Sequence, residues 1–339
     1  MIRVAINGFG RIGRAFLRLS VSNPEIDIVA INDLASVENL VYLLKYDSAY
    51  GTFPHKITSR DGALVVDSKE ISFISEKDPS KLPWARMGID VVVECTGFFA
   101  DYEKANAHIR AGAKKVVISS PVEDSKKGSS AHGATVLMGV NIDTLHTCDI
   151  SANASCTTNA ASPVVTIMEE SLDIQKAILN TIHAVTASES IVDSPNKKDF
   201  RKNRSALVNI IPTTTGAAEA TTKAVKGIEF FNGISVRVPV LVGSLVDITF
   251  IAGRDTSVEE VNQIFRKASE EKRWEGIFTV SEEPLVSSDI VGNTYASIVD
   301  LQMTKVVGGN LVKVLAWYDN EMGYTNTLVR HVIETGKNI

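Results

Sequence analysis

The sequence predicts an α/β protein in which a doubly wound parallel sheet is joined to an α+β domain with a mainly antiparallel sheet. Short apolar runs alternate with helical patterns through the first 150 residues or so, as in sheets whose parallel strands are connected by helices. A glycine-rich turn joins the first of these strands to the first helix. From about residue 176 the strands lengthen and few helices separate them, which indicates antiparallel pairing.

The amino-terminal part supplies the strands of the parallel sheet. An alternating apolar run at residues 2–6 predicts the first strand, and apolar residues at helical spacing from 16 to 19 predict the first helix. A second run, 26–31, is almost entirely apolar, as a strand buried on both faces should be, and it ends at Asn32 and Asp33. Further strands are predicted at 91–93, 115–118 and 136–140.

The carboxyl-terminal part supplies the second sheet and two clear helices. Ser257 is placed to cap a helix over residues 257–273, in which Val261 and Phe265 lie on one apolar face. Helical spacing also predicts a closing helix over residues 321–337. The longer strands are predicted at 177–182, 235–240, 245–252, 294–301 and 311–318.

Length, charge and cysteine content limit the classes of function. A chain of 339 residues favours two domains, because single cores stop growing at about 250–300 residues. The net charge of −5 gives no electrostatic reason to bind nucleic acid or anionic membranes. Cys95, Cys148 and Cys156 are an odd number in a large chain and lack metal-ligand spacing. We therefore expect no metal, no disulfide framework and a reducing, cytoplasmic setting.

Polar residues interrupt both segments that could be mistaken for targeting or membrane sequences. Asn7 and two arginines lie within what would have to be the apolar core of a signal peptide. The longest apolar stretch, 236–252, is broken by an arginine, a proline and Asp247. That stretch is typical of paired strands, so neither secretion nor a membrane span is expected.

The turn after the first strand has the spacing of a dinucleotide-binding motif. Gly8, Gly10 and Gly13 follow a predicted strand and open a predicted helix, and Asp33 ends the second strand twenty residues after Gly13. Glycines allow a pyrophosphate to approach the helix N-terminus, while a carboxylate accepts hydrogen bonds from ribose hydroxyls. A plain structural turn is the alternative. Because Asp33 would repel a 2′-phosphate, NAD is favoured over NADP.

Cys156 stands at the start of a predicted helix, with His183 as its candidate partner. Small polar residues at 151–159 lead into an apolar helical stretch. Unpaired amide N–H groups and the positive end of the helix dipole stabilise a thiolate, so we expect a nucleophile usable at neutral pH. His183 ends the strand predicted at 177–182 and is the best placed of six histidines to act as a base. The alternatives are an inert buried cysteine and a hydrogen-bonded strand-end histidine.

A basic run between residues 196 and 204 contrasts with the acidic chain as a whole. It is followed by a turn at 212–216 that opens an alanine-rich helical segment, and the amides of such a turn can bind an anion. With Thr157, Thr186 and Arg237, the chain offers more hydroxyl and cationic donors than one phosphate needs. Two anion pockets are therefore plausible, with a solvated loop as the alternative.

Five segments, in this order, carry a family resemblance. They are Asn7-Gly8-Phe9-Gly10-Arg11-Ile12-Gly13-Arg14, Leu43-Leu44-Lys45-Tyr46-Asp47-Ser48, Ala154-Ser155-Cys156-Thr157-Thr158-Asn159, Ile211-Pro212-Thr213-Thr214-Thr215-Gly216 and Trp317-Tyr318-Asp319-Asn320-Glu321. Over essentially its whole length the chain resembles phosphorylating glyceraldehyde-3-phosphate dehydrogenase. The resemblance implies a Rossmann cofactor domain over 1–155 and 320–339, a catalytic domain over 156–319, and a homotetramer. It also implies NAD-dependent oxidative phosphorylation of glyceraldehyde 3-phosphate to 1,3-bisphosphoglycerate in glycolysis or gluconeogenesis.

The same resemblance implies roles for individual residues. Cys156 would attack the aldehyde to give a thiohemiacetal, with His183 supporting the thiolate, polarising the carbonyl and accepting the hydroxyl proton. Hydride would pass to NAD, and inorganic phosphate would cleave the resulting thioester. Substrate and phosphate contacts fall on Ser155, Thr157, Thr186, Lys202, Thr215, Gly216 and Arg237. Cofactor contacts fall on Gly8, Phe9, Gly10, Arg11, Ile12, Gly13, Asn32, Asp33, Lys77, Thr96, Ser119, Asn320 and Tyr324.

Several positions depart from the family pattern. Lys202 replaces the second of two adjacent arginines and loses the planar guanidinium fork, which predicts weaker phosphate binding. Residues 187–189 are Ala-Ser-Glu where the family usually has a Gly/Asn-Asp-Gln pattern, while the key Thr186 is kept. Ser194 replaces a leucine beside the adenine ribose and could tolerate a 2′-phosphate better, although NAD is still expected.

Two other interpretations fit the chain less well. Erythrose-4-phosphate dehydrogenase, a relative that passes its thioester to water, usually lacks a threonine three residues after the histidine and lacks the Thr-Thr-Thr-Gly turn. This chain has both. A non-catalytic dinucleotide-binding protein would tolerate loss of the Cys156 and His183 pair, which this chain keeps.

Overall fold

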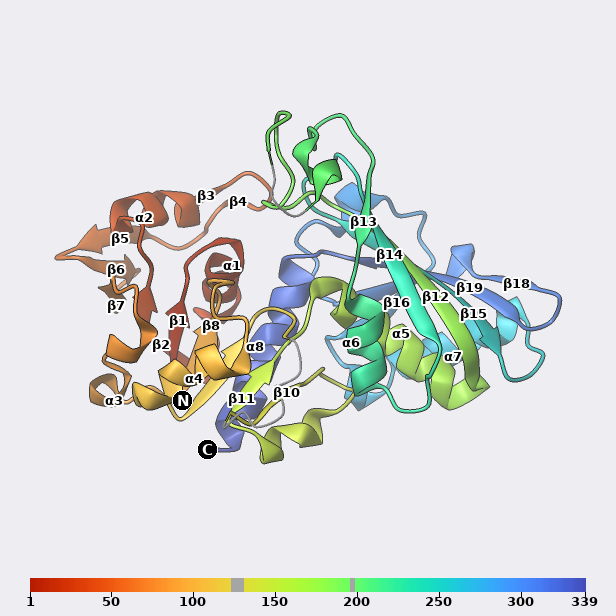
Figure 1. Cartoon of the computed structure of the whole chain (residues 1–339), viewed down its shortest axis with the longest axis horizontal. Helices are drawn as coiled ribbons and strands as arrows, with labels where there is room; N and C mark the ends of the chain where they lie inside the picture. Colours follow the sequence, from red (N-terminus) through yellow and green to blue (C-terminus); the bar gives the residue numbers. More distant parts are fainter. Residues whose placement is uncertain (123–130, 196–198) are drawn as a thin grey trace. The chain divides into compact units, whose positions relative to one another are not determined.

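The computed structural model describes residues 1–122, 131–195 and 199–339, and the chain divides into two compact units (Figure 1). The first unit comprises Met1–Ala154 and Thr325–Ile339. The second comprises Ser155–Tyr324. Each unit is built on one large sheet.

The described residues of the first unit form a nine-stranded sheet with the order β10-β11-β9-β8-β1-β2-β7-β6-β5. Every pairing from β10 to β7 is parallel, whereas β6 pairs antiparallel with both β7 and β5. The mostly parallel sheet confirms the predicted doubly wound arrangement. The strands are β1 Ile2–Asn7, β2 Ile26–Asn32, β5 Ile57–Arg60, β6 Ala63–Val66, β7 Lys69–Ile74, β8 Val91–Glu94, β9 Lys115–Ile118, β10 Gly133–Thr135 and β11 Ile150–Ala152, with β3 Tyr46–Asp47 and β4 Gly51–Thr52 as a separate pair.

The helices of the first unit begin in two different ways. Ser36 and Asp101 cap α2 and α4 by accepting hydrogen bonds from backbone N–H groups of the first turn. In contrast, α1 begins after Gly10 without a side-chain cap, so no capping side chain competes for its first N–H groups. The helices are α1 Arg11–Ser20, α2 Val37–Lys45, α3 Trp84–Met87, α4 Tyr102–Arg110 and α8 Met322–Lys337, which enters this unit at Thr325.

The core of the first unit joins the middle of the sheet to the helices beside it. Ala5, Val92 and Val116 lie on three adjacent strands and have no exposed surface. They belong to one apolar cluster with Trp84 of α3 and Tyr102 of α4. This packing holds the ends of these strands in fixed positions.

The prediction of a strand at 136–140 is wrong. The strand lies earlier, at Gly133–Thr135, and the chain then turns at Gly139, which has a φ of +78°. Asn141 stabilises the turn, because its Oδ1 accepts a hydrogen bond of 2.8 Å from the Leu137 N–H. Val136, Leu137 and Met138 are buried, so the hydrophobicity of this run reflected burial and not strand pairing.

The described residues of the second unit form an eight-stranded sheet with the order β13-β14-β12-β15-β19-β17-β16 and with β18 paired to β19. Its pairings are antiparallel except for β12 with β14 and β16 with β17, which confirms a mainly antiparallel sheet. The strands are β12 Ile174–His183, β13 Ile211–Thr214, β14 Phe231–Arg237, β15 Ser244–Ala252, β16 Phe278–Ser281, β17 Ser297–Asp300, β18 Lys305–Val307 and β19 Leu311–Tyr318.

Three α-helices pack against this second sheet (Figure 1). They are α5 Cys156–Leu172, α6 Ala217–Ala224 and α7 Val258–Ser269. The predicted helix over 257–273 ends earlier, and a short 3₁₀ turn follows it. The 3₁₀ turns of the chain are η1 Pro79–Lys81, η2 Ile142–Thr147, η3 Phe200–Asn203, η4 Lys272–Trp274, η5 Ser287–Ile290 and η6 Leu301–Met303. Residues 157–168 of α5 are all buried, so this helix is a rigid support for the cysteine at its start.

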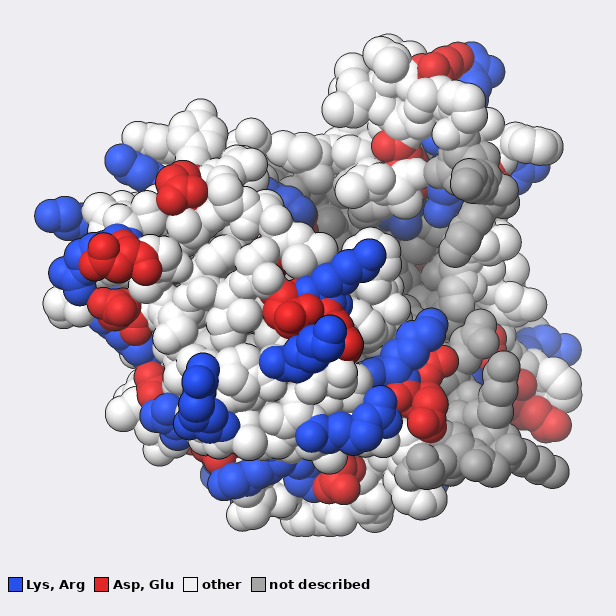
Figure 2. Space-filling model, turned by 60° about the vertical axis from the view of Figure 1, so that its left-hand side comes forward, with Lys and Arg blue, Asp and Glu red and all other residues white. Residues whose placement is uncertain are grey.

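Surface charge and helix composition bear on the classes of partner. On the face drawn in Figure 2, lysine and arginine side chains are interspersed with aspartate and glutamate. Within the described part of the chain, no helix combines the length and the apolar content that crossing a membrane requires.

Candidate active site and cofactor pocket

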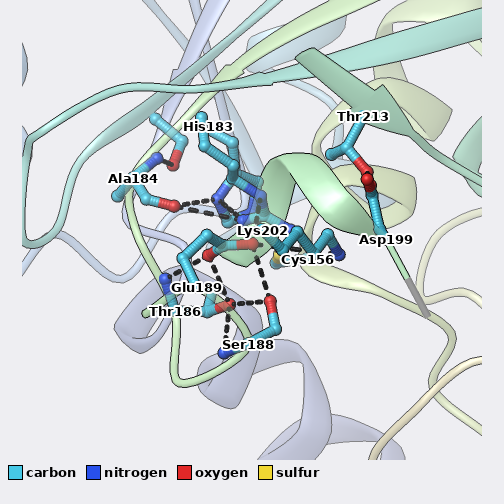
Figure 3. A network of polar contacts seen from close by, with 11 residues as sticks. Cys156, His183, Ala184, Thr186, Ser188, Glu189, Asp199, Lys202 and Thr213 are labelled. Carbon is cyan, nitrogen blue, oxygen red and sulfur yellow. Dashed lines mark hydrogen bonds and ion pairs between the residues drawn. The ribbon is translucent and has the colours of Figure 1, made fainter. Parts of the chain in front are cut away.

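Cys156 is the first residue of α5, and its sulfur lies beside the imidazole of His183 (Figure 3). The N-cap of the helix is Ser155, whose Oγ accepts a hydrogen bond of 3.1 Å from the Thr158 N–H. His183 is the last residue of β12, so a strand in the middle of the sheet carries the imidazole. The distance from Cys156 Sγ to His183 Nε2 is 3.3 Å. The two residues predicted to be nucleophile and base are thus in contact.

Burial is the largest influence on the Cys156 thiol and raises its pKa. The Arg237 guanidinium and the hydroxyl and backbone of Thr157 act in the opposite direction but do not outweigh burial. The helix start does favour a thiolate, because the backbone N–H groups of Cys156 and Thr157 lower the pKa, but the burial of the sulfur has the larger effect. The thiol needs a proton acceptor, and His183 is in contact with it.

His183 is neutral at neutral pH, because burial and the Arg237 guanidinium lower its pKa to about 4. Its Nδ1 lies 2.6 Å from the Ala184 carbonyl oxygen and also contacts Arg237 Nη1. A neutral imidazole carries one ring hydrogen. If Nδ1 donates that hydrogen to Ala184, Nε2 can accept the Cys156 proton. If Nδ1 accepts from Arg237, Nε2 carries the hydrogen and can donate it to a thiolate.

Tyr318 lies beside the cysteine and histidine, and sequence reasoning gave it no role. Its hydroxyl is 3.0 Å from Thr157 Oγ1 and 2.8 Å from Thr181 Oγ1. Its ring meets the His183 imidazole edge to face, with 6.0 Å between the ring centres. Thr157, a predicted phosphate contact, is therefore buried with its hydroxyl turned to Tyr318. The signal for Tyr318 was its place beside Asn320 in the fifth family segment.

The loop after His183 places the carboxylate of Glu189 close to three predicted anion-binding residues. Two of them, Thr186 and Lys202, are labelled in Figure 3. Glu189 Oε2 accepts hydrogen bonds from the Thr186 N–H at 2.9 Å and from Thr186 Oγ1 at 3.1 Å. The other oxygen, Oε1, lies 3.8 Å from Lys202 Nζ and 3.7 Å from Arg237 Nε. Thr186, Lys202 and Arg237 are thus close together, but around an acidic side chain that the sequence marked only as a departure.

The basic run and the turn at 212–216 supply further groups. Residues 196–198 of that run lie outside the described residues. Asp199, which follows them, accepts a hydrogen bond of 3.0 Å from Thr213 Oγ1 (Figure 3). Thr215 Oγ1 accepts from the Ala217 N–H at 3.2 Å, and Gly216 is the N-cap of α6. The predicted second group of anion donors therefore lies at the N-terminus of a helix.

A cavity of about 530 Å³ in the first unit opens beside the glycine turn. Its lining includes six of the predicted cofactor residues, namely Gly8, Gly10, Asn32, Asp33, Lys77 and Thr96. Further lining residues are Asn7, Leu34, Glu76, Pro79, Cys95, Phe98 and Phe99. A volume of this size with a few polar groups is suited to a small-molecule cofactor.

The glycine turn requires glycine at two of its positions. Gly8 has a φ of +92°, and a Cβ there would lie 2.7 Å from the Thr96 backbone nitrogen. A Cβ at Gly13 would lie 2.2 Å from the Gly8 carbonyl oxygen. Asp33 fixes the turn from the second strand, because its carboxylate accepts hydrogen bonds from the Phe9 N–H at 2.7 Å and the Ala35 N–H at 2.9 Å. Asp33 is also one of the residues that line the cavity.

The other predicted cofactor residues have varied surroundings. Phe9 is fully buried, Ile12 is half-buried in α1, and the Arg11 guanidinium pairs with Asp47. Ser119 follows β9, where its N–H donates to the Glu94 carbonyl at 2.9 Å. Asn320 and Tyr324 are buried residues of the second unit. Asn320 Oδ1 accepts hydrogen bonds from the Gly243 N–H at 3.2 Å and Ser244 Oγ at 3.0 Å.

A buried polar network beneath the cavity escaped sequence analysis. Glu94 accepts hydrogen bonds from Asn7 Nδ2 at 2.5 Å, His108 Nε2 at 3.0 Å and the Thr96 N–H at 2.7 Å. Trp84 Nε1 donates to His108 Nδ1 at 3.0 Å, which leaves Nε2 as the nitrogen that donates to Glu94. The only signal was an acidic residue at the end of an apolar strand.

The described residues do not show the arrangement that a metal site requires. Across residues 1–122, 131–195 and 199–339, no group of three or more histidine, cysteine, aspartate or glutamate side chains is arranged to hold a metal ion.

Comparison with known proteins matches both parts of the chain to one family. Residues 2–102 match the family model described as glyceraldehyde 3-phosphate dehydrogenase, NAD binding domain, and residues 155–320 match the corresponding C-terminal domain. The chain is 47% identical over 335 residues to a glyceraldehyde-3-phosphate dehydrogenase of Thermotoga maritima, covering 97% of each chain. It is 44% identical over 336 residues to one of Clostridium acetobutylicum, again covering 97% of each. With one of Zymomonas mobilis it shares 42% identity over 342 residues, covering 100% of this chain and 99% of the relative.

Proposed function

This chain belongs to the glyceraldehyde-3-phosphate dehydrogenase family, with NAD as its cofactor, and we propose that it converts glyceraldehyde 3-phosphate and inorganic phosphate to 1,3-bisphosphoglycerate. The observation that carries this proposal is the distance of 3.3 Å between Cys156 Sγ and His183 Nε2 at the start of α5. A cysteine in contact with a neutral imidazole is suited to covalent acyl transfer. The hydroxyl of Thr186 and the cationic side chains of Lys202 and Arg237 suit a phosphorylated substrate.

In the proposed mechanism, His183 Nε2 accepts and donates the proton at each step. His183 Nε2 accepts the thiol proton as Cys156 Sγ attacks the aldehyde carbon, and it returns the proton to the carbonyl oxygen to complete a thiohemiacetal. It takes the proton again as the hydride leaves, so the acyl group remains on Cys156 as a thioester. Inorganic phosphate then attacks the acyl carbon, the C–S bond breaks, and the sulfur leaves as a thiolate that His183 can reprotonate.

The first unit has the groups that NAD needs. The close approach of backbone at Gly8 and Gly13 and the uncapped start of α1 suit a pyrophosphate, and the Asp33 carboxylate suits ribose hydroxyls. When bound, NAD would supply the hydride acceptor for this oxidation. In this proposal Asn320 orients the carboxamide of the cofactor, and the buried Asn320 side chain is itself fixed by its bonds to Gly243 and Ser244.

The anion contacts divide into two groups in this proposal. Thr186 and Arg237 hold the phosphate of the aldehyde, while Ser155, Thr157, Lys202, Thr215 and Gly216 serve inorganic phosphate. The cofactor domain is taken as 1–155 with 320–339 and the catalytic domain as 156–319. The protein acts as a cytoplasmic homotetramer.

The decisive experiment measures NAD reduction with glyceraldehyde 3-phosphate, with and without phosphate or arsenate. The native chain should turn over only when one of these anions is present, and Cys156→Ser should be inactive because an alcohol is a far weaker nucleophile than a thiol. Cys148→Ser is the matched control, since Cys148 lies in the first unit and is not assigned to the chemistry. Turnover without phosphate or arsenate contradicts the phosphorylating assignment, and an active Cys156→Ser contradicts the nucleophile. An assay with erythrose 4-phosphate as the substrate tests the competing assignment, erythrose-4-phosphate dehydrogenase.

A further inference from the structure

Glu189 is a fully buried carboxylate at the centre of the loop that follows β12 (Figure 3). A tight turn places it there, because the Glu189 N–H donates to the Thr186 carbonyl at 3.3 Å. Its two oxygens accept hydrogen bonds from the Thr186 N–H, Thr186 Oγ1 and Ser188 Oγ at 2.7 to 3.1 Å. Such a carboxylate is costly to bury, so the groups around it must compensate its charge.

Two cations provide that compensation. Lys202 Nζ and Arg237 Nε lie 3.8 and 3.7 Å from Glu189 Oε1. Although burial acts in the other direction, the hydrogen bonds from Ser188 and Thr186 and the charge of Arg237 lower the pKa of Glu189, so it is ionised at neutral pH. The three charged side chains therefore sum to a formal charge of +1, where a glutamine at position 189 would leave +2.

We propose that Glu189 is an internal counter-ion that competes with ligand anions for Thr186, Lys202 and Arg237 and thereby sets the anion affinity of the site. The inference rests on the proposed function for the identity of the natural ligands, which are the phosphate of the aldehyde at Thr186 and Arg237 and inorganic phosphate at Lys202. The competition itself follows from the contacts of Glu189.

The competition has both a geometric and an electrostatic part. The Thr186 hydroxyl has one hydrogen, which Glu189 Oε2 and Ser188 Oγ are already placed to accept. Arg237 Nε is buried and has no hydrogen-bond partner in the described residues, so the guanidinium keeps a donor that the carboxylate approaches without satisfying. A dianion entering here must take these donors from Glu189 and must also withstand its negative charge. Residue 189 therefore makes the site selective against highly charged anions.

The test is anion binding to the intact protein without NAD or aldehyde. Sulfate, a dianion that no step of the proposed reaction consumes, is titrated calorimetrically against the native protein and Glu189→Gln at neutral pH. The Kd for sulfate should fall about ten-fold or more in Glu189→Gln, because one nearby negative charge is removed from a poorly solvated site. An equal or higher Kd would overturn the proposal.

Three further variants test whether the effect depends on the charge of residue 189, on its position and on the Thr186 hydroxyl. Glu259→Gln makes the same change of charge on a side chain that is 82% exposed in α7, and its sulfate Kd should stay within about two-fold of the native value. Glu189→Asp keeps the charge and should bind sulfate no tighter than the native protein. Adding Thr186→Val to Glu189→Gln should reduce the gain, because one of the released donors is lost, and a gain of unchanged size shows that sulfate binds elsewhere and contradicts the proposal.

Glu189→Gln leaves two partly buried cations without their carboxylate, and this imbalance gives a second readout. If the variant unfolds in anion-free buffer, sulfate should refold it, because an external anion can replace the internal one. Failure to refold at any sulfate concentration contradicts the proposal. These measurements need no turnover, so a chain without dehydrogenase activity would refute the proposed function, while sulfate binding would still test the role of Glu189.

Discussion

Two buried carboxylates, Glu94 in the first unit and Glu189 in the second, have similar burial but different partners. Glu94 accepts hydrogen bonds from uncharged side chains and a backbone amide, those of Asn7, Thr96 and His108. Glu189 combines hydroxyl and backbone donors with two cations, Lys202 and Arg237. The first carboxylate therefore joins elements of the fold, and the second is surrounded by groups suited to binding a ligand.

The two carboxylates differ in whether their partners are also suited to binding a ligand. Asn7 ends β1, Thr96 follows β8 and His108 lies on α4, so Glu94 ties together three elements beside the cavity. An entering cofactor need not break these bonds. Thr186 and Arg237, in contrast, cannot serve Glu189 and a phosphate fully at the same time. A buried carboxylate thus acts as framework or as competitor according to its partners, not its burial.

The largest effect is expected from removing the framework carboxylate. Glu94→Ala leaves the Asn7 amide, the Thr96 N–H and the His108 Nε2–H without their buried acceptor. The free energy of unfolding should fall by about 3–5 kcal/mol, as when one partner of a buried network is deleted. Denaturant unfolding checks this value. Glu70→Ala, on an exposed ion pair with Arg60, is the control and should cost less than about 1 kcal/mol. An equally small loss for Glu94→Ala would contradict the framework role.

The hydrogen bonds of Glu94 could not be predicted from the sequence, although the surrounding fold could. Gly8, Gly13 and Asp33 were identified because local rules link their chemistry to positions in a strand, turn and helix. The contacts of Glu94 join residues far apart in the chain, and its nearest signal was a single acid after three valines. Pairings of this kind depend on tertiary packing, which periodicity does not encode.

The second unit shows the same limit. Cys156 and His183 were found because a helix start and a strand end are local features, and the structure brings them into contact. The helix start lowers the pKa of Cys156, but the opposing effect of burial could not be predicted, since the depth of burial is not a local property. Glu189 was noted only as a departure, because its meaning depends on cations that follow it by 13 and 48 positions.

A second prediction compares the units through one buried histidine in each. The pKa of His183 in the second unit is lowered to about 4 by burial and Arg237, and that of His331 in the first is lowered to about 3 by burial. Both folded values lie below the unfolded value of about 6.5, so the unfolded chain binds more protons in acid. Stability should therefore fall as pH drops from 6.5 toward 4, by up to about 1.4 kcal/mol per pH unit for each histidine.

Denaturant unfolding between pH 8 and pH 4.5 measures this slope. His331→Gln removes one titrating group while keeping side-chain donors and acceptors for Ser151 and Asn153, so it should reduce the slope by about half. Stability that does not change below pH 6.5, or a slope unaltered by His331→Gln, would refute the assignment of these histidines as buried neutral groups.

A third prediction concerns Arg237, which lies near both Glu189 and the proposed nucleophile Cys156. Arg237 lowers the pKa of the Cys156 thiol, so Arg237→Gln should raise that pKa further and slow alkylation at Cys156 by about ten-fold. Arg237 also lowers the pKa of His183, so the comparison is made at pH 8.5, where the imidazole is neutral in both proteins. Mass spectrometry of iodoacetamide-treated protein gives the rate at this site. An unchanged or faster rate would mean that Arg237 does not act on the sulfur.

The smallest effect is expected at Lys202. Lys202→Arg introduces a planar guanidinium group that can donate two parallel hydrogen bonds to one phosphate. This change should lower the KM for inorganic phosphate. Because Glu189 Oε1 lies 3.8 Å from the Lys202 ammonium, the new guanidinium also has a carboxylate to pair with, so the decrease should be only about two- to three-fold. The decrease should be larger when Lys202→Arg is combined with Glu189→Gln, which removes that competitor. Steady-state kinetics at varied phosphate measures both values, and a KM that is unchanged or raised in both backgrounds would rule out a phosphate contact at residue 202.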